Sequence, residues 1–294
     1  MPLPQPLAEQ LGHILTEKLN DRVQVRDALP VAGGSINDAY RLHTNAGEFF
    51  VKTNPSARFP SPFNSEKRGL DVLRQAGVLR VPEVLAQGEF DGTAFLLMEF
   101  IAQKEGDRIF QARFGHALAQ LHRHTQERFG LDHDNYIGLL PQVNTLHGDW
   151  VEFLVQCRLE PLVRLARDNG RIHPGDPIRF ERLYARLPAL IPPALPALLH
   201  GDLWKHNCLM AVSGEPVLID PAVYYGHREM DVAMTRLFGG FEPDFYEAYN
   251  SADPLDEGWE ERVDLCNLYP LLVHLNLFGG SYAGRIGAIL RKHV

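Results

Sequence analysis

Cysteine is scarce in this chain of 294 residues, which contains only Cys157, Cys208 and Cys266. Three is an odd number, and no pair shows a Cys-x-x-Cys spacing, so the sequence argues against a disulfide framework and against a cysteine-ligated zinc site. Cysteines that form neither disulfides nor zinc sites are typical of proteins in reducing compartments. We therefore expect a cytoplasmic protein.

A basic surplus and a long apolar run are also missing. The 29 Lys and Arg residues are outnumbered by 37 Asp and Glu residues, which leaves a net charge of −8. Broad nucleic-acid or anionic-membrane binding needs a basic face, so we expect neither partner. No apolar run reaches the length of a transmembrane helix, and residues 1–6 lack the basic start and apolar core of a signal peptide.

The hydrophobic pattern predicts a strand-rich beginning. We expect a helix near residues 7–19, strands over 23–29, 39–44 and 49–53, a helix over 63–76, and strands over 84–90 and 94–100. Asp91-Gly92 between the last two strands is a strong hairpin signal. These residues indicate a small antiparallel-sheet lobe.

From Arg113 onward the periodicity becomes helical, and strand-like residues return only at 198–219. This order predicts a bilobal α+β fold, with an N-lobe over 1–101 and a larger, mostly helical C-lobe over 102–294. The hinge between the lobes is expected at 102–106.

The most informative stretch runs from His200-Gly201-Asp202 to Asn207 and continues to Asp220, which ends an apolar strand. Phosphoryl transfer needs a proton acceptor for the attacking hydroxyl and oxygen ligands for Mg²⁺. Asp202 is a candidate catalytic base, and Asn207 with Asp220 are candidate metal ligands. A second His-Gly-Asp at 147–149 has no Asn five residues later, so we do not interpret it as a site.

The spacing also predicts a geometry for the metal pair. Strands over 208–212 and 216–220 flank Ser213-Gly214, which are good turn residues. A two-residue turn would place Asn207 opposite Asp220, with Cβ atoms about 5 Å apart, close enough to share one Mg²⁺. A turn of three or five residues would change this register.

The N-terminal strands supply the other half of a nucleotide site, in the order found in protein kinases. Gly33-Gly34-Ser35 is expected to form a glycine-rich turn, Lys52 ends a predicted apolar strand, and Glu66 falls on the next predicted helix. The turn and Lys52 are suited to ATP phosphates, and Glu66 to holding Lys52 by an ion pair. A lone strand lysine is usually solvated, but this order favours the kinase interpretation. Met98-Glu99-Phe100 then enters the hinge, where backbone groups would meet adenine.

Together these residues resemble the fructosamine-3-kinase (ketosamine-3-kinase) family, within the aminoglycoside- and choline-kinase-like superfamily that shares a protein-kinase-like fold. The resemblance runs through Gly33–Asn37, Phe50–Lys52, Glu66, Asn135–Gly138, Pro141–Asn144, Asp149-Trp150, His200–Trp204, Ile219–Glu229 with Asp231, and Leu237–Phe241. It implies phosphorylation of a ketoamine, free or on a glycated protein lysine, at the sugar C3 hydroxyl. Such a reaction removes early glycation adducts. Its cofactors would be ATP and Mg²⁺, with Asp202, Asn207, Asp220, Lys52 and Glu66 in the roles given above.

Several residues are candidates for the acceptor pocket. Trp204 is a candidate substrate wall or a core residue. Tyr225, His227, Arg228 and Glu229 are candidates to shape the pocket, and an internal ion pair of Arg228 with Glu229 is the alternative for those two. We expect Asp231 to order the catalytic loop. His274 is either a core histidine or a pocket residue, and we favour the core. Lys205-His206 departs from the small residue and Gly that relatives often carry there.

Two other functions stay open. The first is a kinase for another small acceptor, such as an aminoglycoside, choline or a sugar. A long acidic tract in the C-lobe would favour polycationic aminoglycosides, and none is present. The second is an ATP-binding pseudokinase that acts by interaction. The presence of Lys52, Asp202, Asn207 and Asp220 argues against it.

Overall fold

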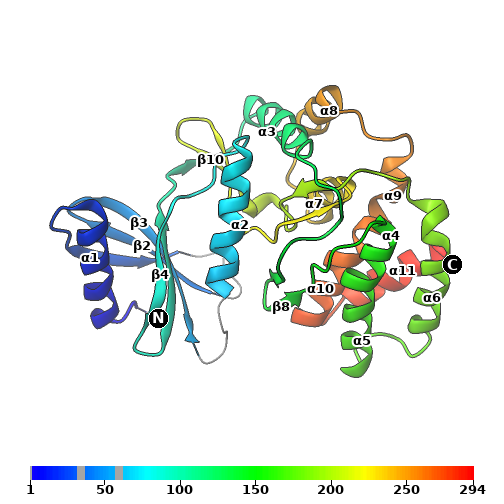
Figure 1. The fold of residues 1–294 in the computed structure, drawn as a ribbon, viewed down its shortest axis with the longest axis horizontal. Coiled ribbons are helices and arrows are strands. Elements are labelled where there is room, and N and C mark those ends of the chain that lie inside the picture. Colours follow the sequence, from blue (N-terminus) through cyan, green and yellow to red (C-terminus); the bar gives the residue numbers. More distant parts are fainter. Residues whose placement is uncertain (1, 32–36, 57–61) are drawn as a thin grey trace.

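The computed structural model describes residues 2–31, 37–56 and 62–294. One half of the molecule is an antiparallel sheet with the strand order β1-β2-β3-β5-β4, shown at the left of Figure 1 with helix α1. Its elements are α1 (Gln5–Leu19), β1 (Val25–Pro30), β2 (Asp38–Thr44), β3 (Gly47–Pro55), α2 (Pro62–Ala76), β4 (Val84–Phe90) and β5 (Thr93–Glu99).

Alternation along β5 explains how this sheet is covered on both faces. Phe95 and Leu97 pack into a core with α1, whereas Leu96 and Met98 pack into a core with α2. Successive strand residues point to opposite faces of the sheet. Because α1 covers one face and α2 the other, the continuous apolar run of β5 is buried on both sides. The central strands therefore hold their side chains in place on the α2 face, where the site lies.

The hairpin between β4 and β5 confirms the signal read from Asp91-Gly92. These two residues have φ values of 46° and 71°, and Phe90 pairs with Thr93 across the turn. Positive φ at both central residues is the backbone that Asp-Gly favours in two-residue hairpins. The predicted strand over 84–90 is confirmed, and the next strand begins one residue before its predicted start.

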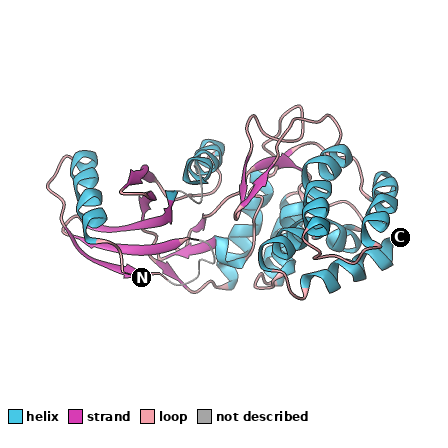
Figure 2. Ribbon diagram, turned by 90° about the horizontal axis from the view of Figure 1, so that it is seen from below, coloured by secondary structure: helices cyan, strands magenta, loops and turns pink. Residues whose placement is uncertain are grey.

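The other half is mainly helical (Figures 1 and 2). Its elements are β6 (Gln103–Lys104), α3 (Arg108–Leu121), β7 (Asn135–Ile137), β8 (Leu140–Gln142), α4 (Trp150–Phe153), α5 (Glu160–Asp168), α6 (Asp176–Leu190), β9 (Ala197–Leu199), β10 (Cys208–Ala211), β11 (Pro216–Leu218), β12 (Tyr224–Gly226), α7 (Glu229–Leu237), α8 (Pro243–Ala252), α9 (Trp259–Cys266), α10 (Leu268–Phe278) and α11 (Tyr282–His293). Within the described ranges no helix is long and apolar enough to cross a membrane. The expected α+β architecture is confirmed.

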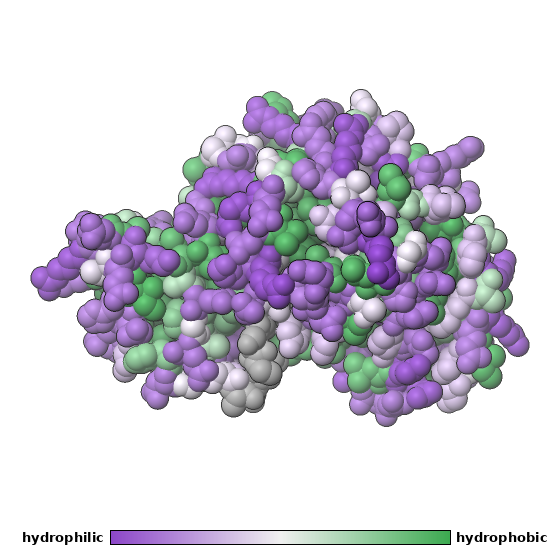
Figure 3. Space-filling view, in the orientation of Figure 1, coloured by the Kyte–Doolittle hydropathy of each residue, from purple (hydrophilic) through white to green (hydrophobic). Residues whose placement is uncertain are grey.

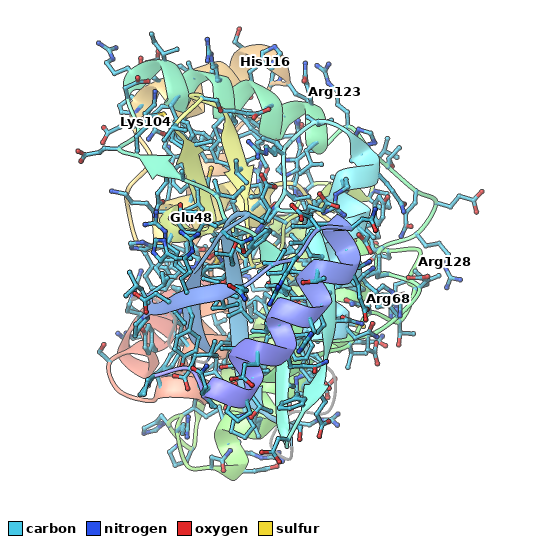
Figure 4. The ribbon with its side chains drawn as sticks, turned by 90° about the vertical axis from the view of Figure 1, so that its left-hand side faces the viewer. Glu48, Arg68, Lys104, His116, Arg123 and Arg128 are labelled. Atoms are coloured by element: carbon cyan, nitrogen blue, oxygen red, sulfur yellow. The ribbon has the colours of Figure 1, made fainter. Side chains whose placement is uncertain are left out.

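The short hairpin β7–β8 contradicts the expectation that, after Arg113, strands return only at 198. A second short strand, β6, lies in the expected hinge and pairs with β10, with Lys104 opposite Met210. Figure 4 places Lys104 at the outer edge of the molecule. Strands of two or three residues are too short to show the alternation on which the prediction depended.

Helices α3 and α8 cross closely at Gly115. A Cβ built on Gly115 would lie 2.1 Å from the backbone oxygen of Phe245, a contact that rigid backbone cannot relieve. Glycine is needed here because two helix backbones meet. By contrast, a Cβ on Gly284 in α11 would meet nothing within 4 Å.

We expect Gly115→Ala to lower the free energy of unfolding by about 3 kcal/mol, since α3 and α8 must separate. Gly284→Ala should instead raise it by up to about 1 kcal/mol, because Ala favours the helix. Chemical denaturation of both variants measures these changes. Equal stability of the two variants would contradict the close crossing.

Candidate active site

A cavity of about 1070 Å³ lies between the sheet half and the helical half. Figure 3 shows the molecular surface indented between the two halves. The cavity is lined by nine of the residues singled out in the sequence: Lys52, Glu66, Met98, Glu99, Phe100, Asp202, Trp204, Asn207 and Asp220. Residues far apart in the chain therefore meet in one place. Gly33, Gly34 and Ser35 lie outside the described residues.

Lys52 is buried and bound to two carboxylates. It stands on β3 opposite Leu96, and its Nζ lies 2.7 Å from Glu66 Oε1 and also contacts Asp220. Burial alone would lower the pKa of Lys52, but the charges of Asp220 and Glu66 outweigh it and raise the pKa. Lys52 is thus a fixed cation inside the cavity, and the interpretation as a solvated strand lysine is wrong.

One end of the cavity follows β5, where the sequence predicted the adenine contacts. Met98 is buried, while the Glu99 carboxylate is paired with Arg80, and the guanidinium of Arg41 lies 4.5 Å from the centre of the Phe100 ring. Glu99 is therefore engaged with a neighbouring cation rather than free.

The turn at His200-Gly201 aims Asp202 into the cavity. Gly201 has φ 85°, and a Cβ there would lie 2.0 Å from the oxygen of Ala222, so only glycine fits. Asp231 accepts hydrogen bonds from the backbone N–H groups of His200 (2.7 Å) and Gly201 (3.0 Å). The expectation that Asp231 orders the catalytic loop is confirmed.

Asp202 has an unusual acidity. Burial and the nearby negative charge of Asp220 raise its pKa to about 7, against an opposing hydrogen bond from Asn207. Asn207 donates from Nδ2 to the backbone oxygen of Asp202 (2.8 Å) and to its Oδ2 (3.1 Å). The carboxylate is thereby oriented, with proton affinity matched to neutral pH, as a general base requires.

The predicted register of the hairpin is wrong. Cys208 pairs with Leu218, and the backbone N–H of Ile219 donates to the oxygen of Asn207, so Asn207 faces Ile219 and not Asp220. The turn holds three residues, 212–214, because Ala211 N–H donates to Glu215 O. Asn207 and Asp220 still line the same cavity, although not as a directly opposed pair.

Three predicted acceptor residues lie elsewhere. Tyr225, Arg228 and Glu229 are absent from the described residues that line the cavity. Arg228 is paired with Asp253 at 2.9 Å, and buried Glu229 with Arg262 at 2.6 Å. Both residues are therefore engaged in internal ion pairs, but with partners distant in sequence and not with each other.

An aromatic wall lines the cavity beside Trp204. The Trp204 ring lies 5.9 Å from Phe238, which lies 4.8 Å from His274, and His274 in turn contacts Phe278 and Tyr282. All five line the cavity, so placing His274 in the core is wrong. His274 and Phe278 lie on α10, whose apolar sequence resembles that of a core helix, and Tyr282 begins α11.

Two further segments of the cavity wall were not assigned from sequence. The β7–β8 hairpin contributes residues 135–139, from the first residue of β7 to the turn. Lys205 also lines the cavity and packs on Gly240, where a Cβ would lie 2.3 Å from Lys205 Cδ. The second His-Gly-Asp has a structural role, since Asp149 caps helix α4 by accepting from the N–H of Glu152 at 2.9 Å.

The family model of fructosamine kinase matches residues 7–294. The chain belongs to the fructosamine kinase family. Among fructosamine kinase relatives, a probable ketoamine kinase of Enterococcus faecium is 40% identical over 277 residues, covering 94% of this chain and 96% of that one. The chloroplastic protein-ribulosamine 3-kinase of Arabidopsis thaliana is 39% identical over 289 residues, covering 96% and 86%.

Solved structures agree with the fructosamine kinase assignment. A protein named as a fructosamine-3-kinase from Thermobifida fusca superposes with a TM-score of 0.85 at 36% identity, covering 96% of this chain and 97% of that one. An aminoglycoside phosphotransferase shares the fold at a TM-score of 0.63 and 17% identity, which shows architecture alone. The resemblance read from the motifs and the protein-kinase-like fold are both confirmed.

Proposed function

We propose that this chain is an ATP-dependent kinase that phosphorylates a hydroxyl group of ketoamines such as fructosamines and ribulosamines, at the sugar C3 position, and so removes early glycation adducts. The observation that carries the proposal is the meeting of Asp202, Asn207 and Asp220 with buried Lys52 in one cavity of a fructosamine kinase. In this assignment, residues 1–101 hold the nucleotide and residues 102–294 supply catalysis and the acceptor site.

Asp202 is the catalytic base of the proposed reaction. Its carboxylate takes the proton of the acceptor hydroxyl, whose oxygen forms a bond to the γ-phosphorus of ATP. The bond between that phosphorus and the β–γ bridging oxygen breaks, and ADP leaves. The protein contributes mainly position and charge to such a transfer.

Lys52, held by Glu66, places a positive charge beside the ATP phosphates. Gly33-Gly34-Ser35 offers backbone N–H groups to the same phosphates. Met98, Glu99 and Phe100 border the adenine. Trp204 supplies an aromatic face for the sugar or its linked amine.

Asn207 and Asp220 fit a magnesium ion. Within the described residues, the amide nitrogen of Asn207 is used by Asp202 while its Oδ1 accepts no hydrogen bond, and only Oδ1 of Asp220 is paired with Lys52. One oxygen of each side chain is therefore available, and such oxygens are the ligands that Mg²⁺ prefers. When bound there, the ion would neutralise charge on the ATP phosphates.

The test is ATP consumption with a panel of acceptors. We expect turnover with fructosamines or ribulosamines, free or on a glycated protein, and phosphate on C3 by NMR. Higher kcat/KM for an aminoglycoside, choline or a simple sugar would contradict the acceptor class. ATP binding without turnover on any acceptor would favour the pseudokinase instead.

Lys52→Met is expected to reduce kcat strongly and, because buried Glu66 loses its cation, to lower the free energy of unfolding by about 3 kcal/mol. The double variant Lys52→Met with Glu66→Gln should recover much of the stability but none of the rate. Denaturant unfolding and steady-state kinetics measure the two effects. Recovery of activity in the double variant would contradict the role of Lys52 on the phosphates.

A further inference from the structure

The backbone at Asp220 adopts a conformation that non-glycine residues avoid. Its φ is 55°, in the left-handed region. A residue held in this way persists only when the surrounding structure fixes it on both sides. On the N-terminal side, the N–H of Ile219 donates to the oxygen of Asn207 at 3.0 Å.

On the C-terminal side, two buried amide side chains hold the next carbonyl groups. Gln142 donates from Nε2 to the oxygen of Ala222 (3.0 Å), and Asn135 donates from Nδ2 to the oxygen of Val223 (2.8 Å). The N–H of Ala222 donates to the oxygen of His200 at 2.9 Å. Ala222 is thus the point where the segment after Asp220 meets the catalytic loop.

The amides are themselves locked at the base of the β7–β8 hairpin. Gln142 Nε2 also donates to Asn135 Oδ1 (2.7 Å), and Gln142 Oε1 accepts from the Tyr269 hydroxyl at 2.6 Å. Gln142 is 2% exposed and Asn135 4%. Both amides are therefore buried, and removing one leaves a buried carbonyl oxygen without its donor.

We propose that Gln142, together with Asn135, is a positioning residue that fixes the strained backbone of Asp220 and hence the direction of its carboxylate. Gln142 does not line the cavity among the described residues, so it acts through Ala222 rather than on a ligand. The packing of helix α2 supports the same segment from the other side, since a Cβ on Gly69 would lie 3.3 Å from the Pro221 ring. The inference rests on the proposed role of Asp220 as a magnesium ligand.

The experiment measures ATP affinity by calorimetry without acceptor, once with Mg²⁺ and once with EDTA. The ratio of the two dissociation constants reports metal-dependent tightening. Gln142→Met, of similar length but unable to donate, should reduce this tightening by about tenfold and leave ATP affinity in EDTA unchanged. Tyr269→Phe is the matched control: it removes a hydrogen bond from the same network but leaves both Nε2 bonds of Gln142. It should lower Tm without changing the ratio.

Undiminished tightening in Gln142→Met would overturn the inference, as would an equal loss in Tyr269→Phe. Absence of tightening in the parent protein would instead overturn the metal role of Asp220, and the inference with it. If Gln142→Met does not fold, Gln142→Glu serves the same purpose. That variant keeps the length and the acceptor for the Tyr269 hydroxyl but, when ionised, has no donor for Ala222, so the same loss is expected.

Discussion

Replacing Asp202 by Asn is expected to reduce turnover by about 10³-fold or more, while ATP binds nearly as in the parent protein. The substitution removes the proton acceptor but keeps the shape and an oxygen that can accept from Asn207. General-base catalysis contributes about 10²–10⁴ to rate, so removing the base should cost about that factor. Steady-state kinetics and calorimetric ATP binding measure the two quantities.

The same variant should be more stable than the parent protein at pH 8 in EDTA. The pKa of Asp202 rises from an ordinary value of 3.8 to about 7 on folding, so the ionised carboxylate opposes folding once the pH exceeds 7. This penalty disappears as the pH falls from 7 toward 4, where the group is protonated in the folded state. The stability gain of Asp202→Asn should therefore shrink over that range. Near-normal turnover, or a gain independent of pH, would contradict the assignment.

Asp220→Ala is expected to eliminate measurable turnover even at high Mg²⁺. The variant removes the charged oxygen ligand and also one of the two carboxylates that hold Lys52. Asp220→Asn is the companion, because Asn tolerates the left-handed backbone at φ 55° and preserves the local fold. Both should fail in turnover with normal circular dichroism. Recovery of either variant by raising Mg²⁺ would contradict the role of Asp220.

Asn207→Ala should lose less activity and be partly rescued by Mg²⁺, since it removes a neutral ligand. Rescue should remain incomplete, because Asn207 also donates to Asp202. Asn207→Asp should bind the metal more tightly yet react more slowly, with a new carboxylate against the base. Titration of activity with Mg²⁺ separates the two variants. Full rescue of Asn207→Ala would show that its contact with Asp202 is dispensable.

The amino-acid sequence by itself determined the local features of this protein. Asp91-Gly92 turns a hairpin because both residues adopt positive φ readily, and Gly201 permits the turn that presents Asp202. A short apolar run predicted the strand that ends at Lys52, and the order of Lys52, Glu66 and Asp202 predicted the kinase architecture. These signals depend on residues that are neighbours in the chain.

Tertiary structure alone decided which side chains meet. A three-residue turn moved the partner of Asn207 from Asp220 to Ile219, a shift that no strand pattern encodes. Arg228 forms an ion pair with Asp253, and Glu229 forms one with Arg262. These partners come close only when α8 and α9 pack beside α7.

The residues of the cavity wall also depend on tertiary structure more than on local sequence. His274 lies on a helix apolar enough to be core, yet it faces the cavity because α10 borders it. The β7–β8 strands are too short for periodicity, and buried amide hydrogen bonds from Asn135 and Gln142 tie them to the segment after Asp220. Backbone propensity acts over a few residues, whereas burial and hydrogen-bond partners depend on segments brought together by packing. The sequence could therefore indicate the catalytic groups, but only the folded chain decided their partners.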